Sequence, residues 1–374
     1  MKGIAFSPSN NFNCYSKIQT NQTPQPIKSL TQIPFPLFNH KNQNLPPLSF
    51  SINSTKTTQT PITQPPPLVV VGSANADIYV EIDRLPKEGE TISAKNGQTL
   101  AGGKGANQAT CGAKLSYPTY FVGQVGDDAH GKLISEALRN AGVRLEYLKS
   151  LGGGVPTGHA VVMLQSDGQN SIIIVGGANM SCWPDKLSDQ DLDVVKKAGI
   201  VLLQREIPDS VNIQVGKAAR SAGVTVIMDA GGMDAPMPQE LLNFVDIFSP
   251  NESELGRLIG MPTANFEQIC QAAAKCHKMG VKQVLVKLGA KGSALFVEGE
   301  KPIRQPIIPT AQVLDTTGAG DTFTASFAVA LVEGKSKEEC LRFAAAAASL
   351  CVQVKGAIPS MPDRKSVLNL LHYV

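Results

Sequence analysis

The sequence predicts an α/β fold: a doubly wound, mainly parallel sheet flanked by helices. Beyond the linker Pro65-Pro66-Pro67, short apolar runs bounded by turn residues alternate with longer amphipathic segments. Strands of a parallel sheet are buried on both faces and are therefore apolar throughout, whereas the helices that cover them are amphipathic. The chain has 374 residues, 42% of them hydrophobic, which is enough for one large domain and an appendage.

Six apolar runs are predicted to be buried strands: Leu68–Val71, Thr119–Val122, Ile200–Leu203, Val224–Met228, Ile247–Phe248 and Val284–Val286. Six segments are predicted to be helices: Asn107–Leu115, Gly131–Ala141, Ser210–Ala222, Phe266–Met279, Thr322–Glu333 and Lys337–Val352. In such folds ligands bind at the carboxyl ends of the strands, which is where the glycine-rich loops of this chain fall.

Two regions break the alternation of strands and helices. Glu90–Leu100 and Gly158–Val175 both show β-like patterning, and the second region contains the turn Asp167-Gly168 between two apolar runs. Two strands joined by such a turn form a hairpin. We therefore expect additional β structure outside the main sheet.

The first 65 residues differ in composition from the rest. Residues 1–76 contain five Lys but no Arg, Asp or Glu, and the segment is rich in Ser, Thr, Asn, Gln and Pro. Such a segment cannot bury enough apolar surface to fold, so 1–65 is predicted to be disordered. An acid-poor, hydroxylated N-terminus is typical of an organellar transit peptide, and the absence of Arg favours the chloroplast stroma. A mitochondrial signal and a cytosolic tail are the alternatives.

Charge and cysteine usage exclude several classes of partner. From Asp77 onward 29 Lys and Arg face 31 Asp and Glu, a net charge of −2, so we expect no nucleic-acid partner. No run of about 18 apolar residues occurs, so we expect no membrane span. The seven cysteines are irregularly spaced and without a Cys-x-x-Cys pair, which favours reduced thiols over a metal site.

The run Asp315-Thr316-Thr317-Gly318-Ala319-Gly320-Asp321-Thr322-Phe323 carries the clearest chemical signal. Glycines let backbone N–H groups approach an anion, and a helix N-terminus adds about half a positive charge. A carboxylate beside such an anion hole is useful when it takes a proton, which predicts phosphoryl transfer to a hydroxyl with Asp321 as the base. The alternative is structural, with the acid as an N-cap after a tight turn.

A second glycine-rich loop, Ala101-Gly102-Gly103-Lys104-Gly105-Ala106-Asn107-Gln108, also opens a predicted helix. By itself it could be a turn with a solvated lysine. The sequence contains no Gly-x-x-x-x-Gly-Lys-Ser/Thr motif, so ATP would be bound by another architecture than the P-loop.

With these two loops the chain resembles the ribokinase-like (PfkB-type) carbohydrate and nucleoside kinases. Ser249-Pro250-Asn251-Glu252-Ser253-Glu254 resembles the family's Asn-x-x-Glu element, and Val71-Gly72-Ser73-Ala74-Asn75-Ala76-Asp77 resembles its substrate motif on the first strand. Order and spacing match from about Leu68 to about Pro362. The resemblance implies a kinase domain over 66–374 with a small β-sheet lid formed from about 78–100 and 155–176, through which two copies can form a homodimer.

The resemblance implies the site residues one by one. Asp321 matches the catalytic base, which also contacts the substrate. Further matches to sugar-binding positions are Asn75, Asp77, Gly103, Lys104, Asn107 and Glu206. Matches to ATP-binding positions are Asn251, Lys287, Gly289, Gly292, Gly318, Ala319 and Gly320.

The resemblance also implies ions beside the co-substrate ATP. Glu254 matches a position that organises Mg²⁺ through water. A monovalent-cation site, expected to hold K⁺, would be formed by Asp315 and Thr317 with carbonyls around Cys351, Val354, Gly356 and Ser360. Two positions depart from the family's pattern. Arg205 is expected to perturb the charge of Glu206, and Ala345 replaces an expected polar residue near the adenine.

The activity that the resemblance implies is ATP-dependent phosphorylation of D-ribose to D-ribose 5-phosphate. The same scaffold serves kinases of fructose, adenosine and pseudouridine, which stay open as acceptors. A catalytically silent family member that acts as an organellar interaction protein is a further alternative, although the intact Gly318–Asp321 run argues against it. A dinucleotide-binding dehydrogenase is disfavoured because Gly-x-Gly-x-x-Gly is missing after the first strand.

Overall fold

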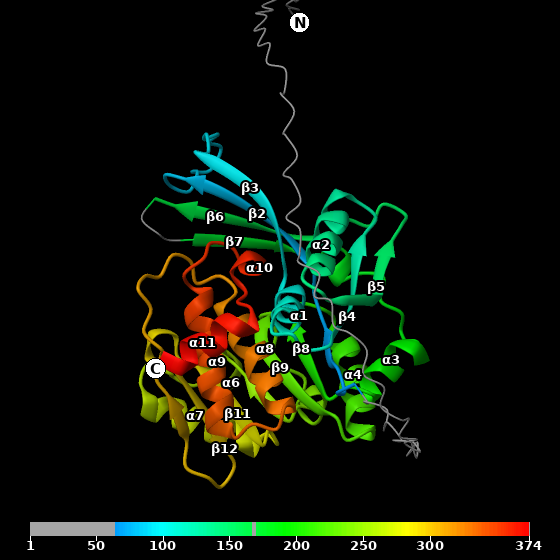
Figure 1. The fold of residues 1–374 in the computed structure, drawn as a ribbon. Helices are drawn as coiled ribbons and strands as arrows, with labels where there is room; N and C mark the ends of the chain where they lie inside the picture. The colour runs from blue at the N-terminus through cyan, green and yellow to red at the C-terminus, as the bar shows by residue number, and fades with distance from the viewer. Residues whose placement is uncertain (1–63, 167–169, 374) are drawn as a thin grey trace, which may run out of the picture. The chain divides into compact units, whose positions relative to one another are not determined.

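The computed structural model describes residues 64–166 and 170–373 (Figure 1). The leader 1–63 and the turn Asp167-Gly168 lie outside the described residues, so the predictions made for them concern parts of the chain that the structure does not describe. No helix in the described ranges is long and apolar enough to cross a membrane.

The main sheet follows the order β13-β12-β11-β10-β9-β8-β1-β4-β5. All its pairings from β11 to β5 are parallel, and only β12 and β13 are added antiparallel at one edge. Its strands are β1 (Leu68–Val71), β4 (Thr119–Gly126), β5 (Arg144–Leu151), β8 (Ile200–Arg205), β9 (Thr225–Gly232), β10 (Ile247–Ser249), β11 (Gln283–Lys287), β12 (Ser293–Val297) and β13 (Ile303–Gln305).

The helices divide into two layers because successive residues of a strand face opposite sides of the sheet. Leu68 and Val70 pack with one layer, and Val69 and Val71 pack with the other. The first layer contains α1 (Lys104–Lys114), α2 (Ala129–Asn140), α8 (Ala319–Val332), α9 (Lys337–Cys351), α10 (Ala357–Ser360) and α11 (Arg364–Tyr373). The second contains α3 (Asp189–Lys196), α4 (Asp209–Ser221), α5 (Gln239–Leu242), α6 (Glu252–Ile259) and α7 (Phe266–Lys278). The doubly wound prediction is confirmed.

A separate four-stranded sheet is the predicted lid. Its order is β3-β2-β6-β7, in which β2 and β6 are parallel and the outer pairs antiparallel. The strands are β2 (Asn75–Ile82), β3 (Asn96–Gly102), β6 (Gly158–Gln165) and β7 (Asn170–Val175). Figure 1 shows this sheet projecting beyond the layer that holds α1 and α10. The predicted hairpin is the antiparallel pair β6–β7. Of the other β-like region only residues from Asn96 onward form a strand.

Two short 3₁₀ turns complete the chain, η1 (Gly177–Asn179) after the lid and η2 (Gly289–Lys291) after β11. Every predicted strand and helix is present with ends shifted by a few residues. The largest shifts at a helix start are those of α1 and α8, which begin at Lys104 and Ala319 and not at Asn107 and Thr322. Ala345 is buried in the core of the first layer.

Arg205 has a structural role that the sequence did not predict. Its fully buried guanidinium binds both carboxylate oxygens of Asp209 at 2.8 and 3.2 Å. It also donates to the carbonyls of Ala235 and Pro236 at 2.6 and 3.2 Å. The expected effect on Glu206 is wrong, because burial raises the pKa of Glu206 and the charge that opposes this is that of Lys104. Arg205 instead ties the loop after β9 to the start of α4.

We predict that Arg205→Met lowers the free energy of unfolding by about 3–5 kcal/mol, because it leaves a carboxylate and buried carbonyls without their partner. Denaturant unfolding of the full-length protein would measure this. Arg257 reaches Asp234 of the same loop from outside at 3.0 Å, with its side chain 34% exposed. The control Arg257→Met should therefore cost less than about 1 kcal/mol. Equal losses in the two variants would contradict the buried clamp.

Candidate active site

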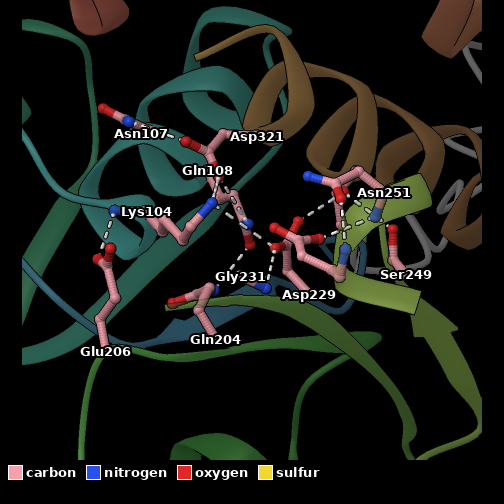
Figure 2. A network of polar contacts seen from close by, with 12 residues as sticks. Lys104, Asn107, Gln108, Gln204, Glu206, Asp229, Gly231, Ser249, Asn251 and Asp321 are labelled. Atoms are coloured by element: carbon pink, nitrogen blue, oxygen red, sulfur yellow. Dashed lines mark hydrogen bonds and ion pairs between the residues drawn. The ribbon is translucent and has the colours of Figure 1, made fainter. Parts of the chain in front are cut away.

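The predicted sugar-binding residues converge where β1 ends and α1 and α8 begin. Figure 2 shows four of them, Lys104, Asn107, Glu206 and Asp321. Asn75 and Asp77 lie on β2 directly after the turn that follows β1, and both are nearly buried. Lys104 is the first residue of α1, and its backbone N–H donates to Glu206 Oε2 at 3.1 Å. Asp321 lies in the first turn of α8. Three elements distant in the chain thus supply one site.

The glycines of the second loop are required by close backbone contacts. Gly103 has φ 91°, and a Cβ there would lie 2.6 Å from the backbone nitrogen of Asn75. A Cβ on Gly102 would lie 2.0 Å from Asp77 Oδ2. Since neither position has room for a side chain, the glycines allow the start of α1 to pack directly against β2, the strand of the predicted sugar-binding residues Asn75 and Asp77.

Asp321, the predicted base, is held by two amides. Asn107 Nδ2 donates to Asp321 Oδ2 at 2.9 Å, and Gln108 Nε2 donates to Oδ1 at 3.2 Å. Burial raises the pKa of Asp321, and the nearby ammonium of Lys104 and these two hydrogen bonds oppose that rise. A buried carboxylate with a raised pKa is a better proton acceptor than an exposed one.

Lys104 is the cation that the site residues share. Its Nζ lies 3.9 Å from Asp321 Oδ1 and 3.8 Å from Asp229 Oδ1. Burial alone would lower the pKa of Lys104, but Asp321, Asp229 and Glu206 raise it above its usual value, so the side chain stays charged. A Cβ on Gly231 would lie 2.4 Å from Lys104 Nζ, so a glycine there gives the lysine access to Asp229.

Asp229, in the second half of β9, was not predicted as a site residue. Its side chain is 1% exposed and lies 2.6 Å from Lys287 Nζ. Burial would raise the pKa of Asp229, but Lys287 and Lys104 lower it to about 2, so the carboxyl is ionised.

Lys287 was predicted to line the nucleotide. Its ammonium contacts Asp229 and lies 3.9 Å from the place that a Cβ on Gly320 would take. It therefore borders the anion hole. The sequence feature that could have identified Asp229 is its position directly after the apolar run Val224–Met228.

On the predicted nucleotide side, Asn251 and Glu254 form a capping box at the start of α6. Asn251 Oδ1 accepts from the backbone N–H of Glu254, and Glu254 Oε2 accepts from that of Asn251, both at 2.8 Å. Gly289 and Gly292 lie in and after the turn η2 with positive φ. Gly318 caps α8 with φ 79°. The N–H of Ala319 donates to the carbonyl of Thr316 at 3.2 Å, whereas that of Gly320 has no partner among the described residues.

The predicted cation-site residues come from two adjoining segments. Asp315 accepts from the backbone N–H groups of Thr317 and Gly356, both at 2.8 Å. Cys351 Sγ and Ser360 Oγ lie 3.1 Å apart, and Val354 is partly exposed between them in the chain. Asp315 forms no ion pair with another described residue, so its carboxylate charge is uncompensated there.

Two buried glutamines behind the base were also missed by sequence reasoning. Gln204 Nε2 donates to Gln108 Oε1 at 2.7 Å, and Gln108 in turn donates to Asp321. This chain of amides fixes which end of Gln108 faces the carboxylate. Gln108 directly follows the predicted site residue Asn107 in the second glycine-rich loop. This adjacency was the only feature of the sequence that could have identified Gln108 as a site residue.

Comparison with known proteins agrees with this geometry. The model of the pfkB family carbohydrate kinases matches residues 66–364, so the chain belongs to this family of sugar kinases. Among its relatives is the ribokinase of Arabidopsis thaliana, 68% identical over all of this chain and 99% of the relative. The ribokinase of Bacillus subtilis is 39% identical over 81% of this chain and 99% of the relative. A solved structure of Arabidopsis thaliana ribokinase complexed with ribose and ATP covers 83% of this chain and all of that one, with a TM-score of 0.80 and 77% identity.

The predicted role of Asp77 implies a pH dependence of sugar binding that can be measured. Burial, followed by the charges of Glu206 and Asp321, raises its pKa to about 7. An ionised Asp77 accepts two hydroxyl protons, whereas the protonated form accepts fewer. We predict that the association constant of the sugar rises with pH by up to about tenfold per unit below pH 7 and levels off above it.

Calorimetric titration between pH 5 and 9 would measure this dependence. The control Asp77→Asn should bind the sugar weakly and should lack the rise of the association constant below pH 7.

The folded pKa of Asp77 lies above the unfolded value of 3.8, so this carboxyl also lowers the free energy of unfolding as the pH rises from about 4 to about 7. Sugar binding by the unaltered protein that does not change over this range would contradict the assignment.

Proposed function

We propose that the protein transfers the γ-phosphoryl group of ATP to the 5-hydroxyl of D-ribose, giving ADP and D-ribose 5-phosphate. The observation that carries this proposal is the position of Asp321, a buried carboxylate in the first turn of α8, near the ammonium of Lys104 and next to Gly320, whose N–H has no partner among the described residues. The Arabidopsis relative whose solved structure contains ribose and ATP supports the choice of acceptor and donor.

Each step of the transfer has a residue beside it. Asn75, Asp77 and Glu206 bind the sugar hydroxyls, and Asp321 removes the proton of the attacking 5-hydroxyl. The oxygen of that hydroxyl forms a bond to the γ-phosphorus while the bond to the β-phosphate oxygen breaks. The N–H groups at the start of α8, that of Gly320 among them, receive the charge that develops on the transferring group, and the lid excludes water that would otherwise compete for it.

The residues present also fit the two expected ions. One carboxylate oxygen of Glu254 is not used by the capping box, which suits Mg²⁺ held through water and ATP phosphates. The carboxylate of Asp315 accepts two backbone N–H groups and forms no ion pair with another described residue, so its remaining negative charge suits a monovalent cation such as K⁺. Bound there, the ions would neutralise phosphate charge and the negative charge next to the anion hole.

The first test is turnover of the purified full-length protein with ATP, Mg²⁺ and K⁺ against ribose, fructose, adenosine and pseudouridine. We expect ribose to have the highest kcat/KM. Asp321→Asn should keep ribose binding and lower kcat by about 10²–10⁴, the usual contribution of a positioned base. Preference for another acceptor would leave the fold and the base as described, and would show that the pocket around Asn75 and Asp77 was assigned to the wrong sugar. No turnover by a folded protein would favour the silent interaction protein.

A second test concerns the monovalent cation. If Asp315 and Thr317 anchor the cation, replacing K⁺ by Na⁺ at constant ionic strength should lower kcat, because a smaller ion fits a fixed ring of oxygens less well. Initial rates in the two salts would measure the difference. Equal rates would count against the site.

We also propose that the lid joins two copies into a homodimer. β7 is an edge strand, and its residues Ile172, Ile173, Ile174 and Val175 are between 42 and 57% exposed. A flat apolar edge strand left in water is prone to pairing. Light scattering should give a dimer mass that Ile173→Lys reduces to that of a monomer. A monomer for the unaltered chain would exclude this dimer.

For localisation we propose import into the plastid, carried by residues 1–65, on the compositional grounds given above. A fluorescent protein fused behind these residues should accumulate in plastids of plant cells. Fluorescence in the mitochondria or the cytosol would assign one of the two alternatives.

A further inference from the structure

We propose that Asn179 is a positioning residue that determines which end of the Asn75 amide faces the sugar, and so sets part of the site's acceptor specificity. The inference rests on the sugar-kinase function proposed above. Asn179 is the last residue of η1, where the chain returns from the lid strand β7 to the main domain. It is 2% exposed and was not among the predicted site residues.

The side chain of Asn179 makes three hydrogen bonds to the turn between β1 and β2. Its Oδ1 accepts from the backbone N–H of Ala74 at 2.9 Å, and its Nδ2 donates to the carbonyl of Ala74 at 3.1 Å. Nδ2 also donates to Asn75 Oδ1 at 2.7 Å. Both hydrogens of the Asn179 amide are therefore used.

These partners fix the orientation of both amides. A backbone N–H only donates and a backbone carbonyl only accepts, so the amide of Asn179 cannot be turned around without losing both bonds to Ala74. Because Nδ2 of Asn179 then points at Asn75, Asn75 must present its oxygen there. The amide nitrogen of Asn75 has no hydrogen-bond partner among the described residues and is left as a donor for a ligand.

The backbone around Asn179 is held just as tightly. Its N–H donates to the carbonyl of Gly176 at 3.0 Å, and its carbonyl accepts from Trp183 Nε1 at 2.7 Å. Gly158, at the start of lid strand β6, packs on the contact: a Cβ there would lie 2.0 Å from Asn179 Nδ2 and 2.5 Å from Asn75 Oδ1. The bond between the two asparagines thus joins η1 to the start of β2, next to the point where β6 enters the lid.

The arrangement gives the site a fixed donor beside a fixed acceptor. Asn75 and Asp77 are two residues apart on β2 and so face the same side of the lid sheet. The Asn75 nitrogen can only donate, whereas an ionised Asp77 can only accept. A polyol fits when one of its oxygens accepts from Asn75 while a neighbouring hydroxyl donates to Asp77. Asn179 ensures that Asn75 acts as the donor in this pair without contacting the sugar itself.

Asn179→Asp tests the proposal because it replaces the amide nitrogen that donates to Asn75 Oδ1 by a carboxylate oxygen, which can only accept. The new carboxylate still accepts from the N–H of Ala74, but it cannot donate to Asn75 Oδ1. The Asn75 amide would rotate to give its nitrogen to the carboxylate, leaving its oxygen toward the sugar. Asn75→Asp reaches the same state by another route, since Asn179 would hold one oxygen of the new carboxylate and leave the other toward the sugar.

The readout is calorimetric affinity of the full-length protein for ribose and for its singly deoxy and deoxyfluoro analogues. A C–F group accepts weakly but cannot donate. In the unaltered protein, fluorine at the position facing Asn75 should bind better than hydrogen there. The quantity to compare is the fluoro-to-deoxy ratio, the association constant of the deoxyfluoro analogue divided by that of the deoxy analogue. In Asn179→Asp and in Asn75→Asp this ratio should fall by about tenfold, and ribose itself should bind about tenfold more weakly. The effect on kcat should be smaller than that on KM, because Asp321 and Lys104 are untouched.

Asn212→Asp is a matched control. Asn212 is also fully buried, and its Nδ2 donates to the backbone carbonyl of Gln204 at 2.9 Å, so the variant likewise buries a new carboxylate. It should lower the thermal midpoint but keep the fluoro-to-deoxy ratio. If Asn179→Asp does not fold, Asn179→Ala serves instead. There the Asn75 amide is free to rotate, and the ratio should approach one.

The outcomes separate the inference from the proposed function. If the unaltered protein does not bind ribose, the proposed function fails, and the analogue series is applied to the acceptor that is bound. If the unaltered protein discriminates between the analogues and the Asn179 variants keep the same ratio, the inference is overturned. The same change in Asn212→Asp would also overturn it, because general destabilisation would then explain the effect.

Discussion

The site depends on one ammonium group among buried carboxylates. Lys104 Nζ lies within 4 Å of Asp321 and Asp229, and its backbone N–H binds Glu206. At low dielectric, like charges this close would protonate or move apart without a cation. Lys104 therefore opposes the protonation of Asp321, and together with Lys287 it keeps Asp229 ionised. The same ammonium leaves the base able to accept a proton, because burial still raises the pKa of Asp321 overall.

The fold brings these charges together through two helices that begin at glycines. α1 and α8 pack on each other in the first layer, and their N-termini meet at the ends of the parallel strands. Residues Asp321–Ala330 of α8 are buried without a break, so the helix is fixed on all sides and the base with it. Burying paired charges in this way contributes little net stability. The large apolar cores on both faces of the sheet offset that cost, and the lid adds the predicted sugar-binding side chains of β2.

Much of the fold and part of the site could be predicted, for different reasons. The strands and helices follow from local periodicity, and the loops around Lys104 and Asp321 were recognised because both place glycines directly before a predicted helix. The lid residues Asn75 and Asp77 came from resemblance alone. Asp229 and Asn179 were missed because their roles come from contacts across the fold: the hydrogen bond from Asn179 to Asn75 spans 104 positions. Arg205 was misjudged because strand geometry turns its side chain away from Glu206, toward Asp209.

The most direct test of this account is the titration of the Asp321 carboxyl itself. Protein labelled with ¹³C at the aspartate carboxyl carbons would be followed by NMR from pH 3 to 9, with the Asp321 signal assigned by its loss in Asp321→Asn. The account predicts that Lys104→Met raises the midpoint of this signal, because burial and Asp229 then act on it without an opposing ammonium, whereas Lys104→Arg changes it less. An unchanged midpoint in Lys104→Met would show that Lys104 does not govern the charge of the base.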